Sequence, residues 1–513
     1  MSEEKDVDYS LKNPDVLTKY KTAAAIGEKV LAAVSQLCVA GEKIVSICQQ
    51  GDKLIEEEVS KVYRTTKLKG KSRIMQPRFS HPTTVSPSSY VTPYTPLTSD
   101  SAEANVALQP GELVKIQLGA QIDGFGSIVC DTIIIPSKDD TQGVVTGRTA
   151  DLILANYYAN ELLLRLMLPP GLLATGTDEE KAKAAAVKPP TQSKITSLLD
   201  KVVKSYECNL VESTTSWLFD RNEIEGSKKI VIAPAEGTKG EGVPQVGEVW
   251  GVEMGVTLGS GKVKTLDQRA TLHRRTTNTY ILKSQTARKT LSTIQAKFGH
   301  FPFSLRQLEE EGSDTKYKVG VFDGVRANVL RQYELVGDKD GAPVARSLTT
   351  LAITKNGITK LGAPPALDLS KYQTDKKITD EEILQILEQP LAKNKGKSKN
   401  KKKKPAKKGE SGENDDECWL ALAGSDVAAM GPDSSLFFLE LPFRTNIPSP
   451  YRVSDPTTTT RPTTLCAHVQ RTKESCHIQV SSFCEAVTRT RNGNGNGKKG
   501  GSLPSRPPRL SQS

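Results

Sequence analysis

The sequence of 513 residues predicts an α/β (α+β) fold: a curved mixed sheet backed by helices in two similar halves, followed by a tail. Three observations predict it. Segments with the two-residue alternation of strands follow segments with the three- and four-residue spacing of helices. This order repeats after about 150 residues, which indicates two halves. The composition changes abruptly near residue 390, which predicts where the tail begins.

Two helices are expected first. Residues 1–14 are polar and are predicted to be flexible. Residues 16–37 and 42–63 carry apolar residues at helical spacing on either side of Gly41. The loop that follows is basic, and its cations are Lys67, Lys69, Lys71 and Arg73. We interpret this loop as a solvated surface, with a second contact to phosphates as the alternative.

A β-hairpin is expected next. Residues 109–116 lead through a turn into an alternating strand that continues to Gly119. The segment Ile122-Asp123-Gly124-Phe125-Gly126 then supplies the turn signal for the returning strand.

Later segments continue the alternation of strands and helices. Residues 146–168 predict a long helix that ends at two prolines and Gly171, and residues 172–192 resemble a surface insertion. Helices are expected at 195–206, 286–298 and 380–387, and strands at 230–232, 248–253, 318–322 and 344–354. The 380–387 helix is expected to pack on the body, with docking on a partner as the alternative. The segment Gly259-Ser260-Gly261 is expected to be a turn between strands.

The hairpin resembles that of the creatinase/methionine aminopeptidase ("pita-bread") family. Within this family the chain resembles the proliferation-associated proteins, also called curved DNA-binding proteins, which are non-catalytic relatives of type 2 methionine aminopeptidase. The likeness covers roughly residues 15–408 with gaps. The blocks that carry it, besides the hairpin, are residues 17–21, 145–148, 301–306 and the lysine run near residue 400.

A dinuclear peptidase of this family would need carboxylates and imidazoles at six positions. Two metal ions roughly 3.5–4 Å apart share bridging carboxylates, so that a bound water becomes a nucleophile at neutral pH. Carried over from the resemblance, the two hairpin aspartates fall on Gln117 and Ile128, and one glutamate is kept as Glu253. The other histidine and glutamate positions fall at Trp217, Leu348 and Pro93. We therefore expect no metal, no cofactor and no catalysis, and we interpret Glu253 as a carboxylate left over from an ancestral site.

Neighbouring residues do not restore the ligand set. Asp123 and Asp131 do not reproduce the spacing between positions 117 and 128, so Asp123 is expected to shape the turn and Asp131 to end or edge a strand. His81 is expected in a loop rich in Ser, Pro and Thr, and His273 and His300 match no ligand position.

The net charge of +11 is concentrated in one segment. Residues 393–408 contain ten lysines and no acid, and residues 409–513 are balanced, so residues 1–392 carry only about +1. Such a segment is expected to be disordered and to bind phosphates, with a purely solubilising or a targeting role as alternatives. Its lysines are Lys393, Lys395, Lys397, Lys399, Lys401, Lys402, Lys403, Lys404, Lys407 and Lys408.

The chain therefore divides into four predicted parts. Residues 1–14 form a flexible N-terminus and residues 15–390 a methionine aminopeptidase-like domain. Residues 391–417 form a lysine-rich and then acidic segment, and residues 418–513 are a low-complexity extension. That extension is expected to be disordered, or to be an error in the predicted coding sequence.

The cysteines and the hydropathy indicate a reducing compartment. The eight cysteines form no C-x-x-C pair, and no apolar leader or run of about 18 apolar residues is present. We expect no membrane segment and no disulfides.

The resemblance implies a non-enzymatic protein that binds the large ribosomal subunit and its rRNA, with curved DNA as a second ligand. It also implies a role in ribosome biogenesis or growth regulation, protein partners, and a place in the cytoplasm and the nucleus, including the nucleolus. We expect a monomer. The alternatives are a metal-dependent methionine aminopeptidase with an altered site and a DNA-binding transcriptional regulator.

Overall fold

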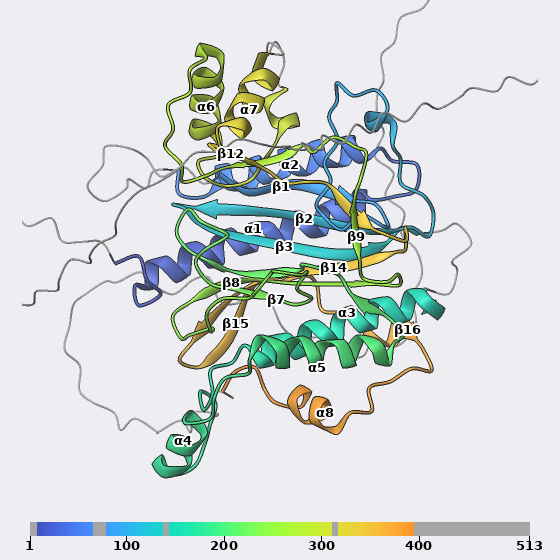
Figure 1. The fold of residues 1–513 in the computed structure, drawn as a ribbon, viewed down its shortest axis with the longest axis vertical. Helices are drawn as coiled ribbons and strands as arrows, with labels where there is room; N and C mark the ends of the chain where they lie inside the picture. Colours follow the sequence, from blue (N-terminus) through green and yellow to red (C-terminus); the bar gives the residue numbers. More distant parts are fainter. Residues whose placement is uncertain (1–7, 65–77, 137–142, 310–315, 394–513) are drawn as a thin grey trace, which may run out of the picture. The chain divides into compact units, whose positions relative to one another are not determined.

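A nine-stranded sheet forms the centre of the protein (Figure 1). The structure is a computed structural model that describes residues 8–64, 78–136, 143–309 and 316–393, all within the compact unit Met1–Lys404. The strand order is β1-β2-β3-β14-β8-β6-β7, with β15 paired to β14 and β5 to β8. These strands are β1 (Arg78–Ser86), β2 (Leu113–Ile122), β3 (Phe125–Ile134), β5 (Asn209–Leu210), β6 (Thr215–Phe219), β7 (Lys229–Val231), β8 (Val249–Thr257), β14 (Val344–Thr354) and β15 (Gly357–Gly362).

The predicted α/β fold is confirmed, but the strand directions differ from the prediction. All described pairs in the large sheet are antiparallel, whereas we expected a mixed sheet. The parallel pair is a separate small ladder of β4 (Val145–Thr146) and β16 (Tyr372–Gln373). The alternation of strands with helices suggested parallel crossovers. Instead, the sheet is built from hairpins and from antiparallel pairs between strands that are far apart in the sequence.

The predicted hairpin is present as β2 and β3. Its turn contains Asp123 and Gly124, both with positive φ, 55° and 84°. The Asp123 carboxylate accepts from Lys19 Nζ at 3.0 Å and from Arg221 Nη2 at 2.6 Å. Asp123 thus shapes the turn, as expected, and also ties it to the first helix and to a neighbouring loop.

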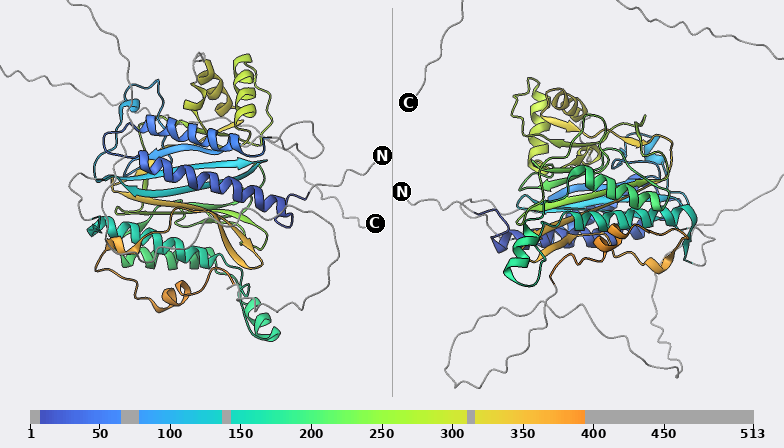
Figure 2. Two further views of the ribbon diagram at one scale, coloured as in Figure 1. Left: turned by 180° about the vertical axis from the view of Figure 1, so that it is seen from behind. Right: turned by 60° about the horizontal axis from the view of Figure 1, so that its bottom comes forward.

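Helices cover one face of the sheet in two pairs (Figure 2, left). The first pair is α1 (Pro14–Leu37) and α2 (Ile44–Lys61), against which Ile116 and Leu118 of β2 pack. The second pair is α3 (Gly147–Leu166) and α5 (Gln192–Ser205), which bury Val252 and Met254 of β8. Because side chains alternate along a strand, the residues between these apolar positions point to the opposite, inner face.

A helical layer and three short ladders complete the body. Helices α6 (Gln285–Lys297) and α7 (Lys316–Arg326) lie together at the upper end in Figure 1. The ladders join β10 (Leu272–Arg275) to β11 (Phe303–Ser304) and β12 (Leu330–Gln332), β9 (Val263–Thr265) to β13 (Val336–Asp338), and β4 to β16. The short 3-10 helices are η1 (Glu103–Asn105), η2 (Leu305–Leu308) and η3 (Leu369–Lys371).

Two predictions of local secondary structure were also wrong. The segment 318–322 is not extended but belongs to α7, where Tyr317, Val321 and Val325 recur at four-residue spacing and pack with α6. His81 is not in a loop but within β1, where Ser and Thr side chains are buried between β2 and α2. Polar β-branched residues fit a buried strand when their hydroxyls find partners, and Thr84 Oγ1 donates to Gln117 O at 3.0 Å.

Two peripheral segments lie at the surface. Residues 172–192 are largely exposed, as expected, and contain a helix that the sequence analysis did not predict, α4 (Asp178–Ala185), begun by a capping box between Thr177 and Glu180. Helix α8 (Glu381–Leu387) begins at the cap Asp380 and buries Ile383 against the cluster of α3 and α5. The packing interpretation of this helix is therefore confirmed. Within the described residues no helix has both the length and the apolarity to cross a bilayer.

A buried ion pair joins α2 to the segment after β11. Asp52 of α2 accepts from Thr83 N at 2.7 Å and from Arg306 Nη2 at 2.8 Å. Both side chains are almost fully buried. This contact explains why an arginine belongs in the 301–306 block.

Replacing Arg306 by Met is expected to lower the free energy of unfolding by about 3–5 kcal/mol, because it leaves a buried carboxylate without its partner. Urea denaturation followed by circular dichroism measures this. The matched control is Lys29→Met, which breaks the exposed pair with Glu58 and should cost less than about 1 kcal/mol. Equal losses in both variants would contradict the buried-pair assignment.

Candidate functional site

The sequence-predicted site positions lie on the inner face of the sheet, away from the helices. Gln117 pairs with Cys130, Cys130 with Leu348, and Leu348 with Glu253, so these four residues form one row across β2, β3, β14 and β8. Antiparallel pairing places directly opposed side chains on the same face. The structure therefore brings Gln117, Leu348 and Glu253 together from three distant segments.

The other predicted positions lie around this row. Ile128 is two residues before Cys130 on β3, and Trp217 pairs with Gly251, two residues before Glu253. Ile128, Leu348 and Trp217 belong to one apolar cluster. Pro93 lies in the loop after β1, and this loop is tied back to β1 because Ser86 Oγ donates to Thr92 O at 3.2 Å.

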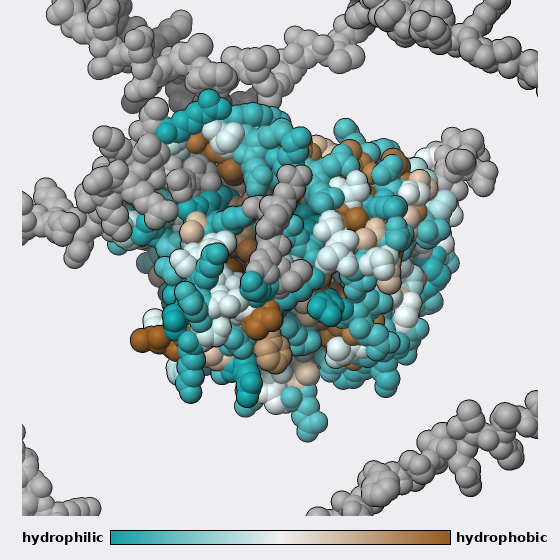
Figure 3. All heavy atoms as spheres, turned by 90° about the horizontal axis from the view of Figure 1, so that it is seen from above, coloured by the Kyte–Doolittle hydropathy of each residue, from teal (hydrophilic) through white to brown (hydrophobic). Residues whose placement is uncertain are grey.

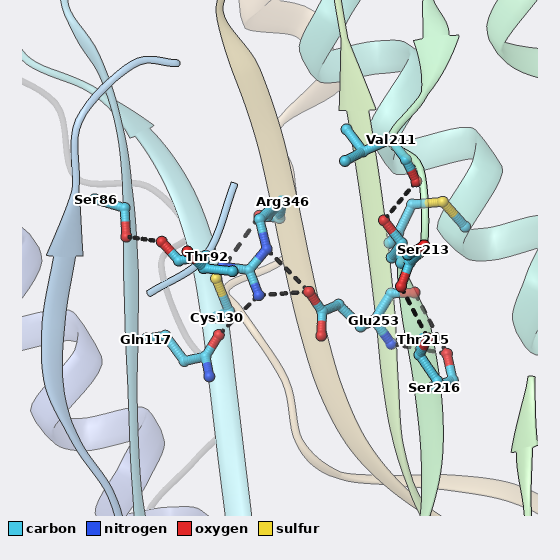
Figure 4. A network of polar contacts seen from close by, with 12 residues as sticks. Ser86, Thr92, Gln117, Cys130, Val211, Ser213, Thr215, Ser216, Glu253 and Arg346 are labelled. Atoms are coloured by element: carbon cyan, nitrogen blue, oxygen red, sulfur yellow. Dashed lines mark hydrogen bonds and ion pairs between the residues drawn. The ribbon is translucent and has the colours of Figure 1, made fainter. Parts of the chain in front are cut away.

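An arginine that the sequence analysis missed occupies the centre of the row (Figure 4). Arg346 Nε donates to Glu253 Oε1 at 2.9 Å, and its Nη2 donates to the same oxygen and, at 3.2 Å, to Gln117 Oε1. The Arg346 side chain is 4% exposed and that of Glu253 is 22% exposed. Although burial disfavours the charge, the neighbouring carboxylate of Glu253 raises the pKa of Arg346 above its ordinary value.

His81 forms the other end of the network. Gln117 Nε2 lies 3.0 Å from His81 Nε2, and His81 Nδ1 lies 2.7 Å from Pro82 O. The arrangement requires that His81 Nδ1 carries the proton and donates to the carbonyl, and that Nε2 accepts from the glutamine amide. Burial lowers the pKa of His81 to about 4, so the ring is neutral at neutral pH.

This geometry gives a physical reason for glutamine at position 117. Its amide accepts from the Arg346 guanidinium through Oε1 and donates to the neutral His81 through Nε2. An ionised aspartate accepts only, and so could not satisfy the imidazole nitrogen. A carboxylate at this position is therefore incompatible with a neutral His81.

Lys115 adds a second buried basic group to the inner face. It lies two residues before Gln117 on β2 and is 1% exposed. Its Nζ donates to Pro87 O at 2.6 Å and to Ser88 O at 2.7 Å. Burial, and next the charge of Arg346, lower the pKa of Lys115 well below its ordinary value. A divalent cation would meet electrostatic repulsion from the Arg346 guanidinium rather than a set of anionic ligands.

The donor set does not fit a dinuclear metal centre. Among the described residues no group of three or more His, Cys, Asp or Glu side chains is placed to hold a metal ion. Burial raises the pKa of Cys130 to about 12, so its thiol stays protonated and is a poor ligand. Glu253, which the resemblance assigns to a ligand position, accepts hydrogen bonds from Arg346 through its Oε1.

Asp123 and Asp131 do not supply the missing carboxylates. Asp123 is engaged at the turn by Lys19 and Arg221. Asp131 pairs with Ile116, whose side chain packs under α1 and α2, so Asp131 faces the helices and not the inner face. It lies inside β3 rather than at its end, which differs from our expectation.

Most of the predicted nucleic-acid contacts lie outside the described residues. These are Lys67, Lys69, Lys71 and Arg73 and the lysines from Lys395 to Lys408. Lys393 is described: it is exposed, and its backbone N–H donates to Asn356 O at 2.8 Å at the end of the β14–β15 hairpin.

Two of the missed residues had a signal in the sequence. Lys115 lies two positions from Gln117, and Arg346 lies two positions from Leu348. In a strand this spacing places both on the face of the predicted site. His81 had no comparable signal, because its segment was interpreted as a loop.

Comparisons with known proteins found relatives that match most of the chain. No family model matches the chain. The curved DNA-binding protein of Schizosaccharomyces pombe is 38% identical over 403 residues, which cover 77% of this chain and 96% of that protein. The ERBB-3 binding protein 1 of Arabidopsis thaliana is 31% identical over 414 residues, which cover 80% of this chain and 95% of that protein. The solved structure titled a thermophilic Arx1 superposes with a TM-score of 0.70 at 68% identity, covering 74% of this chain and 99% of that one.

The fold and the site define a peptidase-like protein: a pita-bread scaffold in which an arginine engages Glu253, the carboxylate that the resemblance assigns to a metal ligand. The chain belongs to the family of proliferation-associated and curved DNA-binding proteins. The resemblance inferred from the hairpin and the 301–306 block is thereby confirmed.

Replacing Gln117 by Glu is expected to raise the pKa of His81 by about 1–3 units from about 4. The reason is that a carboxylate in place of the amide can no longer donate to Nε2 and favours the imidazolium. Nitrogen-15 NMR titration of the imidazole measures the shift. Gln109→Glu makes the same charge change at an exposed position on the approach to β2 and should leave the His81 pKa unchanged. A His81 pKa that stays near 4 in Gln117→Glu would disprove the proposed hydrogen bond between Gln117 and His81.

Proposed function

We propose that this chain is a non-enzymatic nucleic-acid- and ribosome-associated protein that uses a peptidase-like scaffold as a docking body. The observation that carries the proposal is the Arg346–Glu253 pair. The carboxylate that a peptidase would use for its metal instead holds a buried guanidinium. Chemistry at this position would first require that ion pair to break, which costs about 3–5 kcal/mol in a buried site.

A basic surface on the folded body supports nucleic-acid binding. Residues 268–308 contain eight Lys and Arg residues and no acid, and of these Arg274 and Arg306 are buried in ion pairs and are not part of this surface. Within the part of the chain that the structure describes, Lys283 and Lys289 of the α6 region are exposed and make no ion pair. Tyr280 and Ile281 are 52% and 80% exposed just before them. Cations that bind phosphates, beside a ring on which bases can stack, are typical of single-stranded nucleic-acid surfaces.

This surface lies on the side of the molecule shown in Figure 3. The face is mainly hydrophilic, with hydrophobic residues scattered among polar ones. Together with the ten lysines of residues 393–408, it would give two separate groups of phosphate contacts. Lysine contacts favour the backbone over base edges, so we expect weak sequence specificity and steep salt dependence.

The names of the relatives support the choice of partners. The S. pombe relative is named for binding curved DNA, and the A. thaliana relative for binding a protein, ERBB-3. On the basis of the family resemblance, we propose that the main ligand is rRNA of the large ribosomal subunit. DNA would be a second ligand, and the protein would also bind protein partners. We further propose that the protein is a monomer in the cytoplasm and the nucleus, including the nucleolus. Its role would lie in ribosome biogenesis or growth regulation.

We expect the full chain to sediment with large ribosomal subunits at low salt and to be released at high salt. The variant Lys283→Glu/Lys289→Glu should weaken rRNA binding by about tenfold or more, because it reverses two phosphate contacts. Deletion of residues 393–408 should have a similar effect. Sucrose gradients and filter binding against salt concentration measure both.

The matched control for that experiment is Lys183→Glu/Lys188→Glu, which changes the net charge equally on the exposed α4 insertion. It should bind rRNA as the unchanged chain does. Absence of the protein from large-subunit fractions, together with tight binding to DNA, would favour the transcriptional regulator instead.

The purified chain supplied with Co²⁺ or Mn²⁺ is expected to release no methionine from a Met-starting peptide, because the described residues place no carboxylate set to bind the ions. Amino-acid analysis of the reaction measures release. A type 2 methionine aminopeptidase serves as the positive control. Release that disappears in Glu253→Ala would establish the altered metalloenzyme in place of our proposal.

A further inference from the structure

A small pocket lies at the seam between the two halves, on the helical side of the sheet. Strands β3 and β14 pair there at Leu348 and Cys130. The helix pairs α1/α2 and α3/α5 cover the sheet on either side (Figure 2, left). The cavity has a volume of about 100 Å³, and among its lining residues are Asp131, Tyr157, Asn160, Ser347, Pro364 and Pro365.

Polar side chains from three elements face this seam. Asp131 pairs with Ile116, whose side chain is on the helical face, and Ser347 pairs with Met254, which packs under α3 and α5. Asn160 lies one turn after Asn156, whose Nδ2 donates to Met254 O and Ala345 O. Arg346 and Lys360 also line the pocket, whereas Gln117 and Glu253 of the inner-face network do not. Lys360 is engaged by Glu161 and Arg346 by Glu253.

Several of these groups have unused hydrogen-bonding capacity. Asn160 Oδ1 and Ser347 Oγ are buried without a partner, and each residue is only 8% exposed. Asp131 Oδ1 accepts from Thr132 N at 2.8 Å, and within the described residues its carboxylate makes no ion pair. The nearby Glu161 differs, because Lys360 and Arg165 both bond to it. Buried acceptors without donors are costly, which indicates that a donor belongs here.

We propose that this seam pocket binds a primary ammonium group, supplied by a lysine side chain of a partner protein or by a small free amine. An ammonium offers three N–H donors, which match the Asp131 carboxylate, Asn160 Oδ1 and Ser347 Oγ. Its positive charge also compensates the unpaired carboxylate, whereas a water molecule offers two donors and no charge. The volume holds the end of an alkyl chain but not a ring system.

Part of the pocket lining is apolar, which suits the alkyl chain of such a ligand. The segment Ala363-Pro364-Pro365-Ala366-Leu367 lines it with apolar side chains, along which the methylene groups of a lysine can pack. The backbone of this segment is tied to α1, because Ala363 N donates to Glu28 Oε1 at 2.9 Å.

The test uses the full chain and ligand-observed NMR titration with two probes. Ethylammonium represents the free amine, with ethanol as its neutral analogue. Nα-acetyl-lysine methylamide represents the protein source, with its Nζ-acetylated form as the neutral analogue. We expect saturable binding of a charged probe and no binding of its neutral analogue. Tighter binding of the lysine probe would identify a partner protein, and tighter binding of ethylammonium a small amine.

Asp131→Asn, which is nearly isosteric, should weaken binding by about tenfold or more, and Ser347→Ala by a smaller factor. Asp178→Asn is the matched control, since it removes one carboxylate on the exposed α4 and should bind as the unchanged chain does. Circular dichroism verifies that the variants are folded. Absence of saturable binding, or equal binding in Asp131→Asn and Asp178→Asn, would overturn the proposal and leave the pocket to ordered water.

Discussion

The ion pair between Arg346 and Glu253 is the interaction on which the inner face of this protein depends. It lies in a row of side chains from four adjacent strands that are far apart in the sequence. A buried guanidinium needs acceptors on several sides, and Glu253 and Gln117 supply them. Three features follow from the placement of Arg346 beside Glu253. They are the amide at position 117, the neutral state of His81 and the repulsion of a divalent cation.

The same scaffold therefore supports two incompatible kinds of site. Carboxylates and imidazoles on this row would hold cations, whereas here an internal cation and apolar residues occupy the row. Ile128 and Leu348 belong to the apolar cluster beside it, so the space around the positions that the resemblance assigns to metal ligands is filled with hydrocarbon. The retained Glu253 is best understood as the partner of an arginine.

The sequence predicted the hairpin, the two-half fold and most helices, because their signals are local: periodicity, capping residues and turn glycines. It also predicted which positions gather on the inner face, through the family resemblance. It did not predict the Arg346 network, because that contact depends on strand register between segments more than 90 residues apart. Helix α7 was mistaken for a strand because its exposed Val319 and Phe322 obscure the four-residue spacing of its buried side.

The network through Gln117 also limits how this site can evolve. Loss of Arg346 alone would leave the Glu253 carboxylate without its guanidinium. A carboxylate at position 117 alone would require His81 to take up a second proton. Because each single substitution disturbs a partner before it adds a metal ligand, new binding surfaces are easier to evolve on this scaffold than a metal centre.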